Sequence, residues 1–423
     1  MKALFRIGAG LLIFNLAATS GLAQVTGKDV KPATPAPSAG DVLKQFKMPV
    51  DAKDAAQAAD WLEKNFTGTR MPESVRMMIA ILRGSQLGPG EGWFGPAQTR
   101  YTWEWLAARQ GLDPKAGAIL KSQFSGPASL FACLDRNADG RITPDDLDWS
   151  DRNPWVQEAY VVSKFLRRIN TAGDGRLTKE ELLKFFEKTA QGKDYLTTGD
   201  LRQALLGGVS GGFLPGDAPT RDMLIRGLFT GELGSLHEGP AVDQEAPRFK
   251  LKTVDGKQTI ELTKVIGAKP VVLVLGNFTC GPFRSFYPDV EAVYHKYKDQ
   301  ATYLMVYVRE AHPADGWKMS SNQKVGVEVK QPTNLDERCA VANQFCQRLK
   351  PAIPVVVDEI SDPVGHAYSG MPARLYVIDT QGKVAYKSGR GPFGFRVGEM
   401  EQALCMALLE QQLAKQQPAG KNP

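Results

Sequence analysis

A continuous apolar run followed by a cysteine places the strongest constraint on the fold of this chain. Residues 271–276 read Val-Val-Leu-Val-Leu-Gly, and Cys280-Gly281-Pro282 come soon after, ahead of a helical pattern from Ser285 to Tyr297. An apolar run without alternation is typical of a strand buried on both faces. Such a strand must lie in a sheet that other elements cover on each side, which predicts a layered α/β architecture for this part of the chain.

Cys280 lies where a reactive sulfur is favoured, at the end of this strand and at the first turn of the next helix. Helix N-termini carry partial positive charge and N–H groups, which favour a thiolate over a thiol. Phe283 stands where a dithiol Cys-x-x-Cys site has its second cysteine. The pattern therefore predicts a one-thiol site that an external thiol reductant regenerates. The alternative is an inert cysteine at a strand end.

The region around Cys280 has the order of elements typical of a thioredoxin-like fold, with alternating strands and helices followed by a hairpin and a last helix. The expected strands are 248–253, 258–263, 271–276, 302–308, 354–357, 374–379 and 383–387, and the expected helices are 285–298, 334–348 and 396–413. Met371-Pro372 precedes strand 374–379, where this fold holds a cis-proline facing the reactive cysteine.

Residues 135–146 fit the twelve-residue EF-hand loop. Side-chain oxygens at positions 1, 3 and 5 come from Asp135, Asn137 and Asp139, and the position-7 carbonyl belongs to Arg141. Asp146 stands at position 12, where Glu is usual. Asp is one methylene shorter and reaches a cation less easily, so we expect weakened Ca²⁺ binding or a smaller ion such as Mg²⁺.

A second loop, residues 170–181, keeps the shape of the first with fewer ligands. Its candidate ligands are Asn170, Asp174, the carbonyl of Arg176, and Glu181, whereas Ala172 removes the ligand at position 3. Residues 112–123 and 189–200 fit the pattern only in outline. We therefore expect four helix-loop-helix units in two pairs, with the central two loops as metal sites. The alternative is a helical domain whose four loops bind nothing.

The composition is that of an ordinary soluble protein, with 43% hydrophobic and 23% charged residues. The formal net charge of +6 includes Lys2 and Arg6 and is too small to indicate a nucleic-acid partner. Residues 1–23 have the basic start, apolar stretch and small residues of a signal peptide. We expect an exported protein, periplasmic or extracellular, without a membrane span after cleavage. An uncleaved N-terminal membrane anchor is the alternative.

The expected fold class is α+β and multidomain, with an all-α EF-hand domain followed by an α/β thioredoxin-like domain. After the signal peptide, we expect a disordered linker at 24–41, a helical EF-hand-type domain at 42–206, a linker with a short helix at 207–247, the thioredoxin-like domain at 248–414 and a disordered tail at 415–423.

The chain has five cysteines, an odd number that leaves at least one free thiol or an intermolecular bond in an exported protein. Cys339 and Cys346 are seven residues apart in a predicted helix, too far apart along the axis to bond to each other. We expect these two, with Cys133 and Cys405, to serve in packing.

Several segments together resemble the iodothyronine deiodinase family over roughly residues 225–412. They are residues 279–284 (Thr-Cys-Gly-Pro-Phe-Arg), 306–317 (Val-Tyr-Val-Arg-Glu-Ala-His-Pro-Ala-Asp-Gly-Trp), 374–378 and 389–392. The resemblance implies a thioredoxin-like fold and reductive removal of iodine from iodothyronines. Cys280 stands at the position of the family's selenocysteine, His312 is the histidine that works beside it, and Arg390 falls in a motif associated with the substrate pocket.

Thr279 and Phe283 lie in the first of these segments, and we expect supporting roles for them. Glu310 could orient His312 or cap the turn, and Pro372 is expected to support the site as the cis-proline. The chain also departs from the animal enzymes, with Gly281 in place of a second proline. Pro332 or Thr333 replaces a second histidine, and Pro372 an aromatic residue. The EF-hand region has no counterpart in those enzymes.

Three hypotheses follow. In the first, the Cys280 thiolate attacks iodine of a small iodinated phenol, His312 supplies a proton and an external thiol regenerates the sulfur. In the second, the protein is a one-cysteine peroxidase. In the third, it is a non-enzymatic, calcium-dependent interaction module with the thioredoxin-like unit as scaffold. A homodimer is compatible with all three.

Overall fold

A single mixed sheet contains the apolar run of residues 271–276. The computed structural model describes residues 52–66, 71–84, 96–150, 152–206, 219–230, 232–234 and 237–416. Among these residues, eight strands pair in the order β1-β10-β9-β6-β7-β8-β4-β5. Their bounds are β1 Gln98–Thr99, β4 Lys250–Thr253, β5 Thr259–Glu261, β6 Val271–Gly276, β7 Thr302–Tyr307, β8 Val355–Val357, β9 Arg374–Ile378 and β10 Val384–Lys387.

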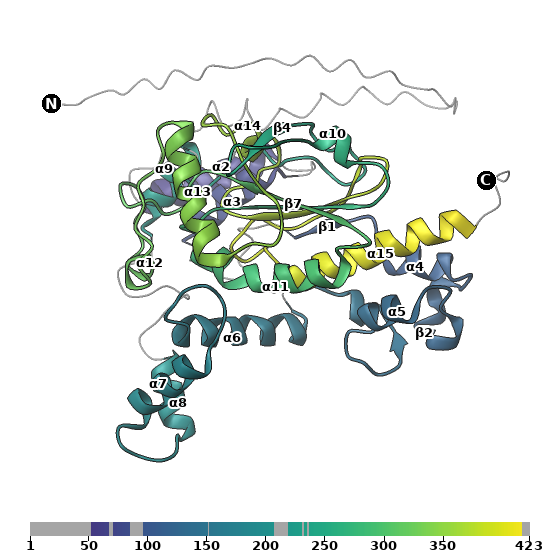
Figure 1. The fold of residues 1–423 in the computed structure, drawn as a ribbon, viewed down its shortest axis with the longest axis horizontal. Coiled ribbons are helices and arrows are strands. Elements are labelled where there is room, and N and C mark those ends of the chain that lie inside the picture. Colours follow the sequence, from purple (N-terminus) through teal and green to yellow (C-terminus); the bar gives the residue numbers. More distant parts are fainter. Residues whose placement is uncertain are drawn as a thin grey trace. The chain divides into compact units, whose positions relative to one another are not determined.

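The helices either pack around this sheet or flank the EF-hand-type loops between residues 112 and 200 (Figure 1). Their bounds are α2 Ala52–Asn65, α3 Glu73–Leu82, α4 Trp103–Arg109, α5 Ala128–Leu134, α6 Pro154–Ile169, α7 Lys179–Ala190, α8 Thr198–Leu206, α9 Arg221–Thr230, α10 Leu262–Val265, α11 Gly281–Tyr297, α12 Ser320–Lys324, α13 Leu335–Leu349, α14 Pro363–Ala367 and α15 Val397–Gln416. Short 3₁₀ turns lie at Pro114–Ala116, Lys121–Gln123 and Pro144–Leu147.

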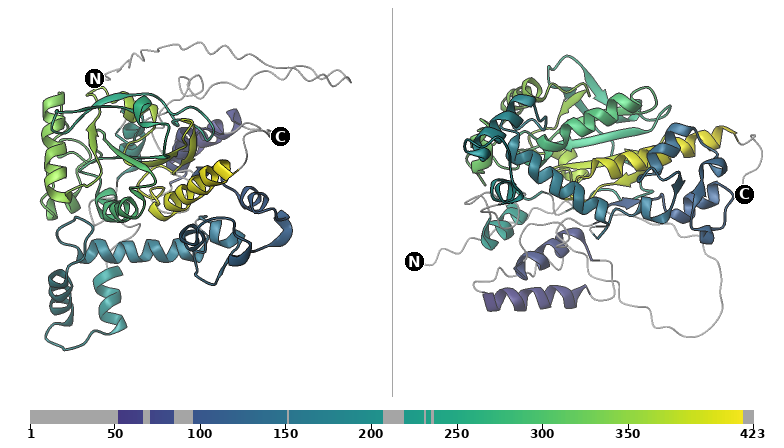
Figure 2. Two further views of the ribbon diagram at one scale, coloured as in Figure 1. Left: turned by 45° about the vertical axis from the view of Figure 1, so that its right-hand side comes forward. Right: turned by 90° about the horizontal axis from the view of Figure 1, so that it is seen from below.

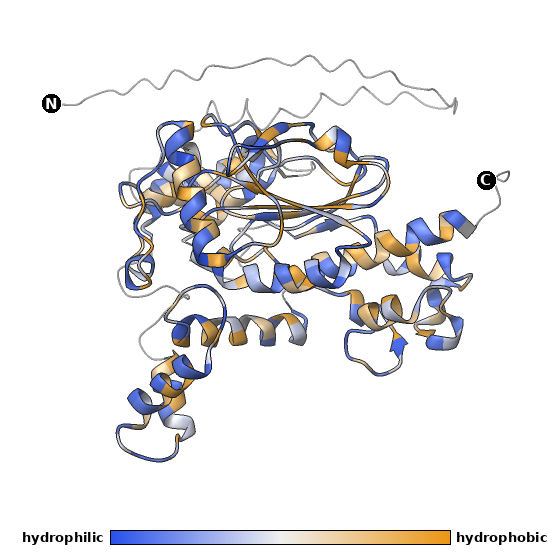
Figure 3. Cartoon of the chain, viewed as in Figure 1, coloured by the Kyte–Doolittle hydropathy of each residue, from blue (hydrophilic) through white to orange (hydrophobic). Residues whose placement is uncertain are grey.

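Strand β6 lies in the interior of the sheet, as its unbroken apolar sequence predicts. It pairs in parallel with β7, from Val271 opposite Thr302 to Gly276 opposite Tyr307, and antiparallel with β9 on its other edge. All six residues of β6 are buried. The central strands of the sheet are coloured largely as hydrophobic in Figure 3. A strand without a polar face is stable only in this doubly covered position.

Helices α11, α13 and α15 cover the same face of the sheet. The crossovers β6-α11-β7 and β7-α13-β8 join successive parallel strands in one direction, so the right-handed rule places both helices on one side. Phe283 of α11 stacks on Phe345 of α13. Lys296 of α11 forms an ion pair with Glu401 of α15 at 2.7 Å. Figures 1 and 2 show α11 and α15 side by side.

Most elements predicted for residues 248–414 are confirmed, with boundaries shifted by a few residues. Helix α11 begins at Gly281 instead of Ser285, because Pro282 occupies its first turn, where a missing N–H costs nothing. Helix α15 continues to Gln416, so residues 415 and 416 are helical and not part of a disordered tail. The predicted cis bond is also confirmed at Met371-Pro372, and a second one occurs at Gly391-Pro392.

The region 42–206 is not all-α, contrary to the prediction. Residues 119–120 (β2) pair with residues 141–142 (β3), with Ile119 opposite Ile142. These isoleucines are the apolar residues of two neighbouring loops, so the pairing confirms that residues 112–123 and 135–146 form one EF-hand pair. Strand β1 from the same region pairs with β10 at the edge of the large sheet. Such long-range pairing leaves no local signal in a two-residue strand.

Two further links join this N-terminal region to the rest of the fold. A disulfide connects Cys133 of α5 with Cys405 of α15, two residues that we expected only to pack in the core. Helices α2 and α3 form a second hydrophobic core with α9 and Trp317. The described residues all lie within one compact unit, Ser38–Pro423.

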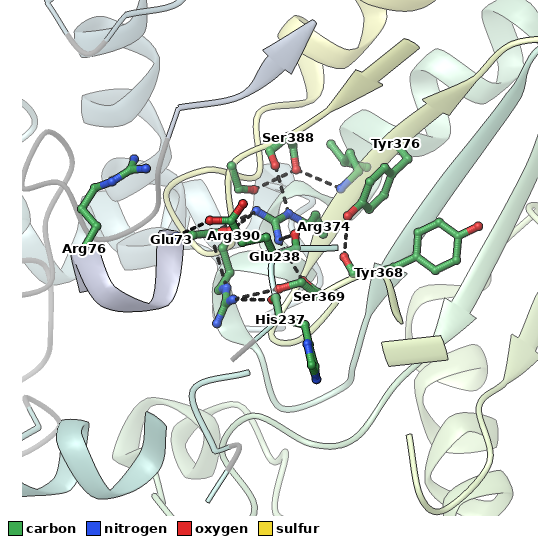
Figure 4. A network of polar contacts seen from close by, with 12 residues as sticks. Glu73, Arg76, His237, Glu238, Tyr368, Ser369, Arg374, Tyr376, Ser388 and Arg390 are labelled. Atoms are coloured by element: carbon green, nitrogen blue, oxygen red, sulfur yellow. Dashed lines mark hydrogen bonds and ion pairs between the residues drawn. The ribbon is translucent and has the colours of Figure 1, made fainter. Parts of the chain in front are cut away.

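Helix α3 also contributes a charge to a buried polar network (Figure 4). The Glu73 carboxylate accepts two hydrogen bonds from Arg374 of β9, at 3.0 and 2.9 Å, and lies 3.5 Å from the Arg390 guanidinium. All three side chains are buried. The arginines bind further to the carbonyl and the hydroxyl of Ser369, respectively. The first helices of the chain are therefore bound to the sheet by a desolvated ion cluster.

Several predictions fall outside the described residues. These are the signal peptide or membrane anchor at 1–23, the linker at 24–41, the first residues of the 42–206 region, most of the glycine-rich segment after residue 206 and the tail from residue 417. Within the described ranges, no helix is both long and apolar enough to cross a bilayer.

Candidate functional site

Cys280 caps the N-terminus of α11, as the sequence predicts. Its side chain is 1% exposed. Its N–H donates to Asn277 Oδ1 at 3.0 Å, and its carbonyl accepts the first helical bond from the Arg284 N–H at 3.1 Å. The sulfur therefore lies at the positive end of a long helix, inside the protein.

Burial has the largest effect on the pKa of the Cys280 thiol. It raises the pKa of the Cys280 thiol to about 11, although the Phe283 N–H and the Arg284 charge act in the opposite direction. We expected the helix terminus to favour the thiolate. That expectation omitted desolvation, which penalises the charged form and here has the larger effect. In this closed arrangement Cys280 is a thiol at neutral pH.

Asn277 organises the site and was missed by the sequence analysis. Its Oδ1 accepts from the N–H groups of Cys280 (3.0 Å) and Ala311 (3.3 Å), and its Nδ2 donates to the Pro372 carbonyl at 2.9 Å. One carboxamide thus joins the cysteine turn, the segment that leads to His312 and the cis-proline loop. Its place between a strand end and the cysteine is the signal that could have marked it.

Thr279 and Glu310 form a buried network with Tyr307 beside the cysteine turn. Glu310 Oε2 accepts from the Thr279 N–H at 2.8 Å and from the Thr279 hydroxyl at 2.7 Å, and its other oxygen accepts from the Tyr307 hydroxyl. Burial raises the pKa of Glu310, against the lowering effect of these donors. The network therefore contains a carboxyl that can hold a proton inside the protein.

His312 lies next to Thr279 through its backbone. Its N–H donates to the Thr279 hydroxyl at 3.0 Å. Its ring Nδ1 lies 3.2 Å from the Trp317 carbonyl, and the two rings meet edge to face at 4.5 Å. A carbonyl only accepts, so Nδ1 carries the hydrogen, and the lone pair of the neutral ring is on Nε2. The structure thus brings Thr279, Cys280, Glu310 and the His312 segment together.

The other two predicted supporting residues, Phe283 and Arg390, are packed into the interior. Phe283 lies under α11 against Tyr287, Phe345 and Phe395, where a Cβ on Gly276 would meet its ring at 2.4 Å. It is a core residue, and its supporting role in the reaction stays a prediction. Arg390 is 0% exposed and faces the Glu73 carboxylate, so its guanidinium is covered in this conformation.

The first calcium loop has a donor set that suits a hard cation. Asp135, Asp139 and Asp146 supply carboxylates, Asn137 an amide oxygen and Arg141 a carbonyl, all within one tight loop. Here these carboxylates bind the loop's own N–H groups: Asp135 accepts from Gly140 at 2.9 Å, and Asp146 from Thr143 at 2.8 Å. Among the described residues, no three acidic, histidine or cysteine side chains converge closely enough to hold a metal.

Hydrogen bonds among its own residues close the second loop. Asn170 Nδ2 donates to Asp174 Oδ1 at 3.1 Å, to the Arg176 carbonyl at 2.8 Å and to Glu181 Oε1 at 3.3 Å. The amide nitrogen therefore binds the oxygens that a metal would need. Although burial opposes the shift, N–H donors from Thr178 and Ala172 help lower the pKa of Glu181 to about 2. These hydrogen bonds close the loop in this structure, and cation binding at these four residues stays a prediction.

The remaining free cysteines of the described chain, Cys339 and Cys346, are half-buried on α13. Burial raises the pKa of Cys346 to about 11 and also raises that of Cys339. Both thiols are therefore less ionised than free cysteine near neutral pH.

Residues 225–407 match the model of the iodothyronine deiodinase family, and residues 128–148 match an EF-hand model. A putative thiol:disulfide interchange protein DsbE from Chlorobium tepidum aligns structurally with 21% sequence identity and a TM-score of 0.29, covering 40% of this chain and 99% of that one.

The curated relatives are vertebrate enzymes. Type II iodothyronine deiodinase of Sus scrofa is 34% identical over 155 residues, which are 36% of this chain and 57% of the relative. Thyroxine 5-deiodinase of Rattus norvegicus is 32% identical over 165 residues, 39% of this chain and 51% of the relative. The chain thus spans little more than half the length of these relatives. Its residues 225–407 are thus similar to the iodothyronine deiodinase family, and an EF-hand match lies earlier in the same polypeptide.

Proposed function

We propose that this protein is a thiol-dependent oxidoreductase that removes iodine reductively from an iodinated phenol, with Cys280 as the attacking group. The observation that carries the proposal is the position of Asn277, which joins the cysteine turn to the cis-proline loop and the His312 segment. A turn fixed at three points holds a nucleophile in one orientation, which is what a direct attack on a substrate atom requires.

The chemical steps balance as follows. The Cys280 thiolate attacks iodine, an S–I bond forms, and the carbon–iodine bond breaks with its electron pair on carbon, which takes a proton. An external thiol then attacks the sulfur of the S–I group, releases iodide and forms a mixed disulfide. A second external thiol reduces this disulfide, so two thiols are oxidised for each iodine removed.

Two groups of the site handle protons in this proposal. Cys280 must lose its proton before it attacks, because burial keeps it as a thiol at neutral pH. In this proposal His312, whose Nδ1 lies 3.2 Å from the Trp317 carbonyl, accepts that proton and then donates it to the phenol carbon. Glu310 holds Thr279 through two hydrogen bonds and thereby keeps both neighbouring segments in place.

We further propose that the first loop binds Ca²⁺ through Asp135, Asn137, Asp139, Asp146 and the Arg141 carbonyl. The EF-hand match over residues 128–148 supports this proposal, and Mg²⁺ is the alternative because Asp146 is short. The ion would stabilise the helix pair.

The test of the proposed reaction is iodide release from an iodothyronine with excess dithiothreitol. Wild type should release iodide, and Cys280→Ser should release none above the thiol alone. Cys346→Ser is the matched control, since Cys346 is a half-buried thiol whose pKa is also raised, and this variant should keep the wild-type rate. Equal release by wild type and Cys280→Ser would overturn the proposal. Peroxide consumption with a sulfenic acid on Cys280 and no iodide release would favour the peroxidase.

A further inference from the structure

Arg284 of α11 carries a buried positive charge, on which Cys280 and then the Glu310 carboxylate act electrostatically without a direct ion pair. Its side chain is 3% exposed and lies one helical turn after Cys280. The guanidinium donates to three uncharged acceptors: the Phe278 carbonyl, Asn322 Oδ1 at 2.7 Å and the Gly173 carbonyl at 3.2 Å. Within the described ranges, no carboxylate forms an ion pair with it. A desolvated charge of this kind is costly unless an anion compensates for it.

The anion that this charge suits is the Cys280 thiolate. The charged groups acting on the sulfur are Arg284 of α11, Arg167 of α6 and Glu310 after β7. The two arginines favour ionisation and the glutamate opposes it. His312 approaches from the segment after Glu310 through Thr279. Of the two arginines, Arg284 lies on the helix that Cys280 caps, one turn after the sulfur.

The polar partners of Arg284 also hold the backbone on both sides of the cysteine. Asn322 Oδ1 accepts from the guanidinium, while Asn322 Nδ2 donates to the Thr279 carbonyl at 2.7 Å. The Phe278 carbonyl, two residues before Cys280, binds the guanidinium directly. The turn that carries the sulfur is therefore organised around this one side chain.

The third partner comes from the second EF-hand-type loop, which packs on the first turn of α11. Besides the Gly173 carbonyl, a Cβ built on Gly175 would lie 2.5 Å from the Ser285 carbonyl oxygen and 2.8 Å from that of Arg284. Only glycine permits this approach. Arg176 in the same loop donates to the Leu349 carbonyl at the end of α13 at 3.4 Å. The second loop thus contacts both α11, which follows Cys280, and the neighbouring helix α13.

We propose that Arg284 is a positioning residue that stabilises the Cys280 thiolate, and that the second loop, closed by hydrogen bonds instead of metal, holds Arg284 in place. The inference rests on the proposed function in one respect, that Cys280 is the reacting thiol. It gives the loop of residues 170–181 a structural role. This role explains why the loop keeps the EF-hand shape although it lacks a full set of metal ligands. The helix-loop-helix region then supports the thiol site directly.

The charge is tested by alkylation of Cys280 with iodoacetamide between pH 7 and 10, followed by mass spectrometry in a Cys339→Ala/Cys346→Ala background. Arg284→Gln removes the charge and Arg284→Lys keeps it. Loss of an adjacent opposite charge shifts a pKa by about 1–3 units, so the Gln variant should react about tenfold or more slowly than the Lys variant at pH 8. Equal rates for the two variants would overturn the proposal.

If Arg284→Gln does not fold, as judged by near-ultraviolet circular dichroism, Asn322→Asp tests the same charge. It brings a carboxylate to the guanidinium and should slow alkylation relative to wild type at each pH below 10. An unchanged pH profile would contradict the role of Arg284. Neither assay needs a substrate, so failure of the deiodination proposal and failure of this one are separate results.

The role of the loop is tested by hydrogen exchange of the first two turns of α11. Gly175→Ala should accelerate exchange there, because the new Cβ displaces the loop. Gly192→Ala is the matched control: its φ is +92° and nothing lies within 4 Å of a Cβ there, so α11 should exchange as in wild type. Two results would overturn the proposed role of the second loop. One is unchanged hydrogen exchange of α11 in Gly175→Ala, and the other is protection of α11 that depends on calcium in wild type.

Discussion

Removal of the Glu73 carboxylate should strongly destabilise β9, the interior strand that follows the cis-proline loop. Glu73 stands between Arg374 and Arg390, and the three side chains are 8%, 2% and 0% exposed. Glu73→Ala would leave both guanidiniums buried without the carboxylate that lies between them, with Glu238 as the other acidic group that acts on both. Breaking a buried ion pair on one side typically costs about 3–5 kcal/mol, because the remaining charge stays desolvated.

Hydrogen exchange as a function of urea measures this cost locally. The free energy of opening of the β9 amides, Arg374–Ile378, should fall by about 3–5 kcal/mol in Glu73→Ala. In Glu73→Ala/Arg374→Met the free energy of opening should be partly restored, because the second substitution removes one of the two unpaired buried guanidiniums. Asp60→Ala is the matched control. It breaks an ion pair with Arg83 whose side chains are 67% and 42% exposed, and it should have little effect on β9.

The pH dependence has a definite sign. Burial alone would raise the pKa of Glu73, but Arg374 and Arg390 outweigh it and lower the pKa below its ordinary 4.5. The ionised Glu73 carboxylate therefore contributes its full stabilisation above pH 4.5, and this contribution is lost as the pH falls below that value. If Glu73→Ala changed the opening free energy of β9 by less than about 1 kcal/mol at pH 7, the ion cluster would not hold α3 to the sheet as argued.

Three further outcomes are expected. Loss of the Cys133–Cys405 disulfide in Cys405→Ser should lower the free energy of unfolding by about 2–5 kcal/mol in urea titrations, and an unchanged midpoint would show that the bond contributes nothing. Calorimetry should find a single calcium site that Asp135→Asn weakens and Glu181→Gln leaves in place, whereas two equal sites would contradict the closed second loop. Because the pKa of Glu181 is lowered from 4.5 to about 2, its stabilisation of residues 170–181 should be present above pH 4.5 and be lost as the pH falls towards 2. Exchange in this loop should rise over that range in wild type and show no such rise in Glu181→Gln.

Local patterns predicted the core of the fold because they express local physics. The unbroken apolar run of β6 could only be a doubly buried strand, and Pro282 after Cys280 favoured a helix start. The loop of residues 135–146 showed its turn and its apolar position, so its pairing with residues 112–123 followed.

Long-range contacts could not be predicted in the same way. Cys133 and Cys405 are 272 residues apart, and nothing near either cysteine indicates its partner. The same holds for Glu73 with Arg374 and for β1 with β10. Desolvation at Cys280 was also invisible in the sequence, because burial depends on every element that covers α11.

The central claim is that Cys280, held by Asn277 in the turn before α11, is the reacting thiol of this protein. The most direct measurement uses intact mass spectrometry of the protein after a single turnover with an iodinated phenol and one equivalent of a thiol reductant. We expect a mixed disulfide between the reductant and Cys280, formed together with free iodide and absent in Cys280→Ser. Iodide release with Cys280 unmodified, or with the reductant bound only to Cys339 or Cys346, would contradict it.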